Sequence, residues 1–216
     1  MPERFWSARN WMVDTQIVPS DVEDQRIVDA MRGVPRHLFV PEHSQHLAYG
    51  DHPVQVGHGQ TISQPYIVGI MTQLARLKPG NKILDVGTGS GYQAAILAEL
   101  GMEVYTIEIL PALAERAAKA LEKAGYTNVH PRVGDGYNGW PEEAPFDAII
   151  LAASPDHVPS PLKRQLAVGG RMVLPVGHTW HQDLVVVRRT APDRWEEHVH
   201  IPVLFVPMTG KGVKSA

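Results

Sequence analysis

Apolar residues recur with two different periods in the middle of the chain. Between residues 82 and 167, short apolar runs that suit buried strands alternate with segments of helical periodicity. Strands are expected at 82–87, 103–108, 129–133 and 146–152, and helices at 91–100, 111–124 and 159–167. This alternation predicts right-handed βαβ crossovers and therefore a doubly wound, mostly parallel sheet of the α/β class.

The pattern changes after Gly169-Gly170. Three extended runs follow, at 171–176, 184–189 and 198–206, and turn-like segments connect them. They predict antiparallel strands at the C-terminal end of the sheet. Trp180 and His181 fall in one of the expected loops, and the pattern assigns them no role.

The N-terminal part of the chain predicts helices and a loop. Residues 20–23 fit the S-x-x-E capping box, which predicts a helix that begins at Ser20 and ends near Gly33. Residues 48–63 are rich in Gly, His and Pro and predict a long loop.

A second N-terminal helix is expected directly after this loop. Its apolar face has the i, i+3, i+4, i+7 spacing of Ile67, Ile70, Met71 and Leu74. Ser63 is the expected N-cap, and Pro65 lies in the expected first turn.

The length of 216 residues suits one structural domain with a sizeable core. We expect residues 1–62 to form a helical and loop addition that packs on a core of residues 63–209. Residues 210–216 carry too few apolar side chains to pack and are expected to form a flexible tail.

A glycine-rich turn follows the first strand of the alternating region. Gly87, Gly89 and Gly91 stand on alternate positions, where they permit positive φ and a close approach of a small molecule. A dinucleotide fingerprint would place Gly or Ala at position 92, where this chain has Tyr92, so NAD is disfavoured. With Asp85 two positions before the first glycine, the turn resembles motif I of Rossmann-like methyltransferases that bind S-adenosylmethionine.

Two further acidic residues follow the next two strands. Glu108 ends the strand after the glycine turn, 21 residues after Gly87, where a carboxylate can accept hydrogen bonds from both ribose hydroxyls of an adenosine. Asp135, between Gly134 and Gly136, could accept a hydrogen bond from the adenine amine, although Asp-Gly is also a common turn dipeptide. Because open α/β sheets bind ligands at the carboxyl ends of their strands, we expect these residues at one edge.

Composition and charge exclude several classes of site and partner. The net charge of −3 and the pI near 6.4 give no electrostatic footprint for nucleic acid. The absence of cysteine excludes disulfides, thiolate metal sites and a thiol nucleophile. The first residues have no apolar signal region, and no run of about 18 apolar residues occurs, so we expect a soluble cytoplasmic protein without membrane contact.

Several motifs together resemble the protein-L-isoaspartate (D-aspartate) O-methyltransferase family. The segment Gly57-His58-Gly59-Gln60-Thr61-Ile62-Ser63-Gln64-Pro65, just before motif I, is the most specific of them. The others are 34–36 with 39–41, 133–136, 144–149, 168–171 with 174–177, and 205–207. They keep the order of the family and span about residues 11–209. One departure is Pro19-Ser20-Asp21, where many relatives carry an Arg-Gly pair.

The resemblance implies a Rossmann-like S-adenosylmethionine-dependent methyltransferase fold and a protein repair reaction. Such enzymes move the methyl of S-adenosyl-L-methionine to the α-carboxyl of L-isoaspartyl residues in damaged proteins and peptides, and release S-adenosyl-L-homocysteine. The family's active-site serine corresponds to Ser63. The implied cofactor-binding residues are Gly57, His58, Gly59, Gln60, Asp85, Gly87, Gly89, Glu108, Asp135, Gly136 and Thr209. The implied substrate-binding residues are Thr61, Ile62, Ser63 and Val206.

The chemistry of the acceptor agrees with an orienting role for Ser63. A carboxyl group with a pKa near 4 is already ionised at neutral pH, so its methylation requires no strong general base. Alignment of the carboxylate with the methyl group and exclusion of water then supply the catalysis. We expect the Ser63 hydroxyl to hold the carboxylate, with no covalent serine intermediate.

Other functions stay open at this stage. The same fold could methylate a small-molecule acceptor, or bind S-adenosylmethionine without catalysis. A Ser/His/Asp hydrolase could use Ser63 with His58 and Asp51 or Asp85, but no G-x-S-x-G elbow is present. His43 and His46 have an i, i+3 spacing, but no second cluster accompanies them, so we expect no metal site.

Overall fold

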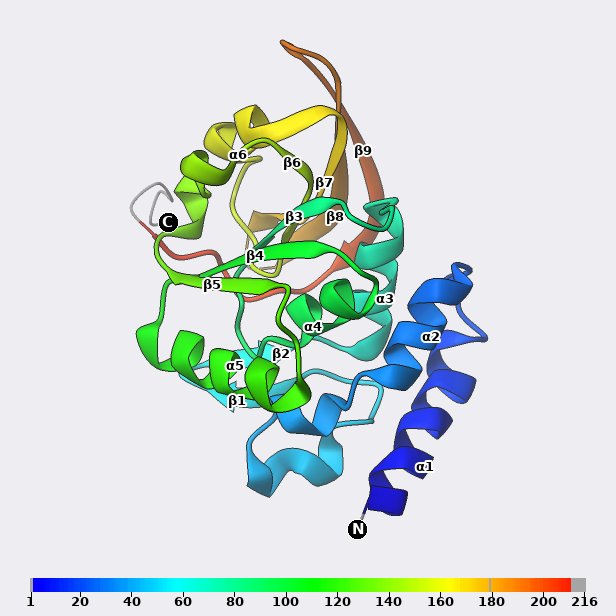
Figure 1. Cartoon of the computed structure of the whole chain (residues 1–216). Helices are drawn as coiled ribbons and strands as arrows, with labels where there is room; N and C mark the ends of the chain where they lie inside the picture. Colours follow the sequence, from blue (N-terminus) through cyan, green and yellow to red (C-terminus); the bar gives the residue numbers. More distant parts are fainter. Residues whose placement is uncertain (1, 179, 211–216) are drawn as a thin grey trace.

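The core of the protein is a seven-stranded sheet, counted within residues 2–178 and 180–210, which the computed structural model describes (Figure 1). The strand order is β5-β4-β3-β6-β7-β8-β9. The strands are β3 (Lys82–Val86), β4 (Glu103–Glu108), β5 (Val129–Val133), β6 (Phe146–Leu151), β7 (Leu166–His178), β8 (His181–Ala191) and β9 (Arg194–Val203). Strands β3 to β7 pair in parallel, and β7, β8 and β9 pair antiparallel. The predicted doubly wound, mostly parallel sheet with antiparallel C-terminal strands is confirmed.

Strand β7 begins earlier than its apolar pattern predicts. The helix before it, α6 (Ser160–Gln165), ends at Gln165, and the strand starts at Leu166 rather than at Arg171. Its first residues pair irregularly with β6, with a register shift between Phe146 and Ala148. The glycines at 169 and 170 fall in this irregular stretch, which hides the strand from a period-2 pattern.

Helices cover both faces of the sheet because alternate strand residues point to opposite sides. One face, with Ile83 and Val104, shares a buried cluster with α4 (Tyr92–Glu99) and α5 (Pro111–Ala124). The other face, with Leu84 and Ile107, packs against Leu162 of α6. Figure 1 shows α4 and α5 on one side of the sheet and α6 on the other.

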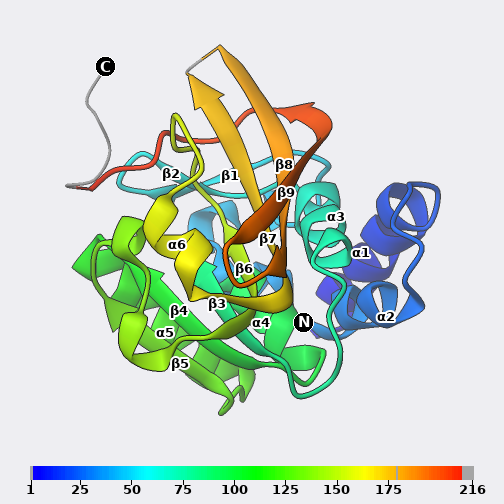
Figure 2. The same cartoon turned by 90° about the horizontal axis from the view of Figure 1, so that it is seen from above.

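The N-terminal segments pack into the same buried cluster as the α4–α5 face. Helix α1 (Pro2–Met12) runs into a π-helical turn, Val13–Ile17, which buries Met12, Val13 and Ile17 completely. Figure 2 shows α1 and α2 (Gln25–Gly33) beside α3 (Pro65–Leu74) at one side of the sheet. The polar sequence of α1 had not predicted this helix.

Helix α2 begins at Gln25, so the predicted capping box at Ser20 is wrong. Its N-cap is Asp24, whose carboxylate accepts the backbone N–H of Arg26 at 3.0 Å. The Ser20 hydroxyl instead accepts the N–H of Val22 in the preceding turn. Two short 3₁₀ segments then follow α2, η2 (Arg36–Phe39) and η3 (Glu42–Leu47).

The predicted loop at 48–63 contains a β-hairpin. Strands β1 (Val54–Gly57) and β2 (Gln60–Ile62) pair antiparallel, and Val54, Val56 and Ile62 are buried. The turn that joins them has positive φ at all three residues 57–59, which explains its two glycines. The strands are too short for their alternation to stand out in the sequence.

No helix in the described part of the chain is both long and apolar enough to cross a membrane. The flexible tail was predicted at 210–216, and its residues 211–216 lie outside the described part of the chain.

Candidate active site

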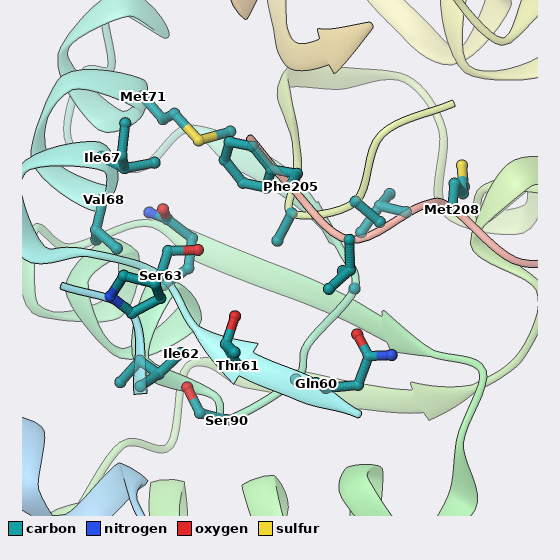
Figure 3. A pocket seen from close by; sticks show the side chains of 18 of the residues that line it. Gln60, Thr61, Ile62, Ser63, Ile67, Val68, Met71, Ser90, Phe205 and Met208 are labelled. Carbon is teal, nitrogen blue, oxygen red and sulfur yellow. The ribbon is translucent and has the colours of Figure 1, made fainter. Parts of the chain in front are cut away.

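A cavity of about 1070 Å³ opens at the carboxyl ends of β3, β4 and β6. Its floor includes Val86, Ile107 and Ala152, which lie at or within one residue of the ends of these strands. Strand β2 and the start of α3 form a second wall, and the segment Leu204–Thr209 forms a third. Figure 3 shows side chains from these walls facing one another across the open space.

The glycine turn between β3 and α4 forms part of the floor. Gly87, Gly89 and Gly91 all have positive φ, at 88°, 54° and 89°, a region that disfavours other residues. A Cβ on Gly91 would lie 3.3 Å from the Ala117 Cβ of α5, so this glycine also permits close helix packing. The ring of Tyr92 is buried and packs edge-on against Phe39 of η2, with the ring centres 5.8 Å apart. A large residue at position 92 is therefore tolerated here.

Glu108 is held rigidly beside the turn at the end of β4. One carboxylate oxygen accepts the N–H of Gly89 at 2.8 Å, and the other accepts the N–H of Leu110 at 3.0 Å. Its side chain is nearly buried and lines the cavity. Because each carboxylate oxygen can accept more than one hydrogen bond, Glu108 keeps acceptor capacity for a diol.

Asp85 lies below the turn and does not line the cavity. It is completely buried, and one carboxylate oxygen accepts the hydroxyl of Thr106 at 2.8 Å. Thr106 in turn shares a 2.6 Å hydrogen bond with the Thr88 hydroxyl in the turn. Burial raises the pKa of Asp85 to about 7, the Thr106 hydrogen bond opposes this shift, and the charge of Glu108 adds to it. Asp85 is thus linked to the cavity through the two threonines.

Gly136 and Asp135 have different positions at the end of β5. Gly136 lines the cavity, and a Cβ there would lie 2.5 Å from a Val86 methyl, so no larger residue fits without a shift. Asp135 is outside the lining. Its carboxylate accepts the N–H of Tyr137 at 3.0 Å and packs against the backbone of Gly210.

Ser63 lies on the opposite wall, between β2 and α3. Its hydroxyl faces the open space in Figure 3 and makes no hydrogen bond within residues 2–178 and 180–210. The prediction that Ser63 is the N-cap of α3 is wrong, because the helix begins at Pro65 and Gln64 is the cap residue. The Gln64 side chain donates to Asp51 at 2.8 Å rather than capping the helix. The N-terminus of α3 thus has no side-chain cap and faces the cavity.

The C-terminal segment forms the third wall and is tied to the loop after β6. The N–H of Ser154 donates to the carbonyl of Val206 at 2.9 Å, and the N–H of Met208 donates to that of Ser154 at 2.8 Å. Phe205 faces Met71 and Ile67 of α3 across the cavity (Figure 3). These side chains make this part of the cavity wall apolar.

The structure brings most of the predicted site residues together. The predicted residues that line the cavity are Gln60, Thr61, Ile62, Ser63, Gly87, Gly89, Glu108, Gly136, Val206 and Thr209. Those outside the lining are Gly57, His58, Gly59, Asp85 and Asp135. The sequence did not single out Thr88, Ser90, Gln93, Ala152, Phe205 or Met208, which also line it. Ala152 could have been found, since it is the last residue of the strand predicted at 146–152.

The hydrolase alternative lacks the required geometry. No hydrogen bond joins the Ser63 hydroxyl to a histidine in the described part of the chain, and His58 is outside the cavity lining. Asp51 is engaged by Gln64. Among the described residues, no group of three or more His, Cys, Asp or Glu side chains is arranged to hold a metal ion.

The strand order, the helices on both faces and the glycine turn after β3 define a Rossmann-like S-adenosylmethionine-dependent methyltransferase fold. The family model described as "Protein-L-isoaspartate(D-aspartate) O-methyltransferase (PCMT)" matches residues 8–213. The chain belongs to this family.

Relatives and solved structures agree with this assignment. The protein named protein-L-isoaspartate O-methyltransferase of Gloeobacter violaceus is 55% identical over 199 residues, which cover 92% of this chain and 97% of that protein. A solved structure described as protein-L-isoaspartate O-methyltransferase has a TM-score of 0.82 at 26% identity and covers 97% of this chain, which spans 66% of that longer chain. Another, assigned to the same family in Plasmodium falciparum and holding S-adenosyl-L-homocysteine, has a TM-score of 0.78 at 23% identity over 95% of this chain and 98% of that chain. At that identity it supports the fold alone.

Proposed function

We propose that this chain moves the methyl group of S-adenosyl-L-methionine to the α-carboxyl of L-isoaspartyl residues in damaged proteins and peptides. The observation that carries the proposal is one cavity with an adenosine-type wall at Gly87, Gly89 and Glu108 and the Ser63 hydroxyl on the opposite wall. Membership of the family supplies the substrate class. The amide nitrogen of the isoaspartyl linkage then attacks the ester carbonyl and expels methanol, which closes a succinimide, and hydrolysis of the succinimide returns some normal aspartyl linkages.

The residues of the first wall fit the methyl donor. Glu108 is pre-oriented by two backbone N–H groups and can accept both ribose hydroxyls. A Cβ at Gly89 would lie 3.7 Å from the Gly87 carbonyl oxygen, an ordinary contact, so the positive φ of 54° is what favours glycine there. Gly136 keeps the backbone close to the place of an adenine ring. We propose that Gln60 and Thr209 close the ends of this subsite, and that Asp85 and Asp135 shape it from behind. When bound, S-adenosylmethionine supplies an electrophilic methyl group.

The residues of the second and third walls fit the acceptor. The Ser63 hydroxyl can donate to the carboxylate, and the start of α3, which has no side-chain cap, adds a favourable field for an anion. Thr61 and Ile62 extend this wall. The backbone N–H of Val206 makes no hydrogen bond within the described residues and can donate to the substrate, while the Val206 carbonyl accepts the N–H of Ser154. An ionised carboxylate requires no base, so Ser63 orients it and stays unmodified.

The partners of the chain follow from this reaction. We propose isoaspartyl-containing proteins and peptides as substrates, with no nucleic-acid partner, because the net charge of −3 provides no basic footprint. We propose the cytoplasm as the site of action, where a chain without cysteine meets no redox constraint.

Labelled S-adenosylmethionine with two synthetic peptides tests the proposal. The peptides have the same sequence and differ by one L-isoaspartyl or normal L-aspartyl residue. We expect labelling of the isoaspartyl peptide alone, as a base-labile methyl ester. Equal labelling of both peptides contradicts the proposal. Labelling of neither peptide by a protein that binds the cofactor also contradicts it, and favours a small-molecule acceptor or a non-catalytic binding module.

A further inference from the structure

Arg36 is a completely buried cation directly behind the acceptor wall of the cavity. It begins η2, has no exposed surface and does not line the cavity. Its Nη2 donates to the carbonyl of Ser63 at 2.7 Å, and its Nε donates to the carbonyl of Ala48 at 2.7 Å. The guanidinium therefore bridges the segment that ends η3 and the segment that carries Ser63.

The partners of Arg36 leave its charge uncompensated. Two carbonyl oxygens accept its hydrogen bonds, and its guanidinium lies 4.7 Å from the centre of the Tyr92 ring. No carboxylate among the described residues forms an ion pair with it. Burial lowers its pKa to about 10, so the group is still charged at neutral pH. Burial of a charge that has no ion-pair partner lowers the stability of the folded protein, so its presence here indicates a role other than stabilisation.

The surroundings of Arg36 connect both halves of the cavity. Tyr92, which lies against the guanidinium, is the first residue of α4 and follows the glycine turn directly. Ser63 presents its carbonyl to Arg36 and its hydroxyl to the cavity (Figure 3). A substrate carboxylate held by the Ser63 hydroxyl would thus bind the same residue whose carbonyl contacts the Arg36 guanidinium. Because this environment is poorly solvated, the positive charge acts over a longer distance than it would in water.

We propose that Arg36 is a positioning residue that fixes Ser63 and supplies the positive charge that draws the anionic acceptor carboxylate into the site. The inference rests on the proposed function and assigns the acceptor side a charge that Ser63 cannot provide. The acceptor is an anion when it binds and a neutral ester when it leaves. The field of Arg36 therefore favours binding of the carboxylate and release of the ester, and acts on KM more than on kcat.

Variants that separate charge from shape test this role. Arg36→Met removes the charge at similar length, Arg36→Gln removes it and keeps hydrogen-bonding capacity, and Arg36→Lys keeps it. Arg32→Met removes an equal charge at α2, where Arg32 pairs with Asp14, and is the matched control. The measurements are KM and kcat for an isoaspartyl peptide, and dissociation constants for that peptide and for its uncharged α-amide analogue. S-adenosylhomocysteine affinity and the thermal midpoint report on folding.

We expect Arg36→Met and Arg36→Gln to raise the KM and the dissociation constant of the isoaspartyl peptide by about tenfold, with a smaller change in kcat. The affinity for the α-amide analogue falls by a clearly smaller factor, because loss of the Ser63 anchor affects both ligands and loss of the charge affects the carboxylate alone. Arg36→Lys keeps most of the preference for the carboxylate. A purely structural role weakens both ligands equally. Equal losses for both ligands in whichever neutral variant folds, or loss of the preference in Arg36→Lys, overturn the proposal.

The unaltered protein separates this inference from the proposed function. Absence of turnover with the isoaspartyl peptide contradicts the proposed function itself. Normal turnover of the unaltered protein, together with equal losses for both ligands in the neutral variants, contradicts the role of Arg36 alone.

Discussion

Ser63 presents an unbonded hydroxyl to the cavity at the start of an uncapped helix, and this combination suits an orienting role. The hydroxyl of a serine at the start of a helix usually accepts a hydrogen bond from a backbone N–H of the first turn. Here Gln64 takes the cap position and its side chain binds Asp51 instead. The hydroxyl of Ser63 is therefore available to a substrate.

Replacement of this hydroxyl should affect transfer more than cofactor binding. We expect Ser63→Ala to lower kcat/KM for an isoaspartyl peptide by about 10- to 100-fold, the range for loss of one hydrogen bond to a charged group. S-adenosylhomocysteine affinity should change less than twofold in a calorimetric titration. Ser160→Ala, at the start of α6, is the control. An unchanged rate in Ser63→Ala would remove Ser63 from the mechanism.

Asp85 makes the free energy of unfolding depend on pH. Its pKa is about 7 in the folded protein and 3.8 in a free side chain, so between these values the folded state binds more protons than the unfolded state. The contribution of Asp85 to the free energy of unfolding thus falls as pH rises from about 4 to 7.

Asp85→Asn removes this contribution and keeps the shape of the side chain. Relative to the unaltered protein, the variant should gain stability with rising pH in that window, by at most about 1.4 kcal/mol per pH unit. Urea unfolding at pH 5 and pH 8 measures the difference, and Asp193→Asn on the exposed β8–β9 turn is the control. A difference that is the same at both pH values speaks against a protonated Asp85.

Single residues could be predicted from sequence where strand order fixes their place. Glu108 and Gly136 follow strands of a parallel sheet, and the carboxyl ends of such strands share one edge. The cap of α3 could not be predicted, because the choice between Ser63 and Gln64 depends on Asp51, 13 residues earlier in the chain. Arg36 carries no local signal either, since its partners are carbonyl oxygens of two distant segments.

At the scale of elements, the short β1–β2 hairpin is where the structure differs from the prediction made from the sequence pattern. The apolar central strands β3, β4 and β6 were predicted closely because they are buried on both faces. The β1–β2 hairpin was missed, because β2 has three residues and a glycine-rich turn precedes it. Long-range contacts decide such elements: Arg116 of α5 donates to the carbonyl of Val56 in β1.

The β7–β8 hairpin extends along the sheet and past it (Figure 2). Trp180, next to the last residue pair of this hairpin, is 93% exposed and yet lines the cavity mouth, as does Leu204, at 75% exposure. An aromatic side chain so placed can bury its surface only when a peptide enters. We therefore expect the hairpin to contact the residues that flank the acceptor.

Trp180→Ala tests this contact. It should raise KM about three- to tenfold for an isoaspartyl peptide with apolar flanking residues, and much less for one with glycine on both sides. The control is Trp6→Ala, since Trp6 on α1 is also exposed and does not line the cavity. Equal KM changes for both peptides would show that the hairpin does not read the flanks.

At the scale of the whole molecule, the N-terminal segments complete the site instead of merely covering the sheet. They share one buried cluster with α4, α5 and one face of the sheet. Arg36 and Phe39 of η2 pack on Tyr92, the residue that follows the glycine turn. In the proposed arrangement the parallel sheet provides the donor side, while β2, the start of α3 and the C-terminal segment provide the acceptor side. The sequence singled out residues on all of these walls, but not the contacts of Arg36 and Phe39 with Tyr92.

Selective methylation within one mixture tests this account most directly. Equal amounts of the isoaspartyl peptide and its aspartyl twin are incubated with the protein and S-adenosylmethionine, and the initial rates of ester formation are followed by mass spectrometry. The account predicts ester on the isoaspartyl peptide with at least about 100-fold preference over its twin, the discrimination expected of a site that must align one carboxylate. Comparable rates of ester formation on the two peptides would contradict it.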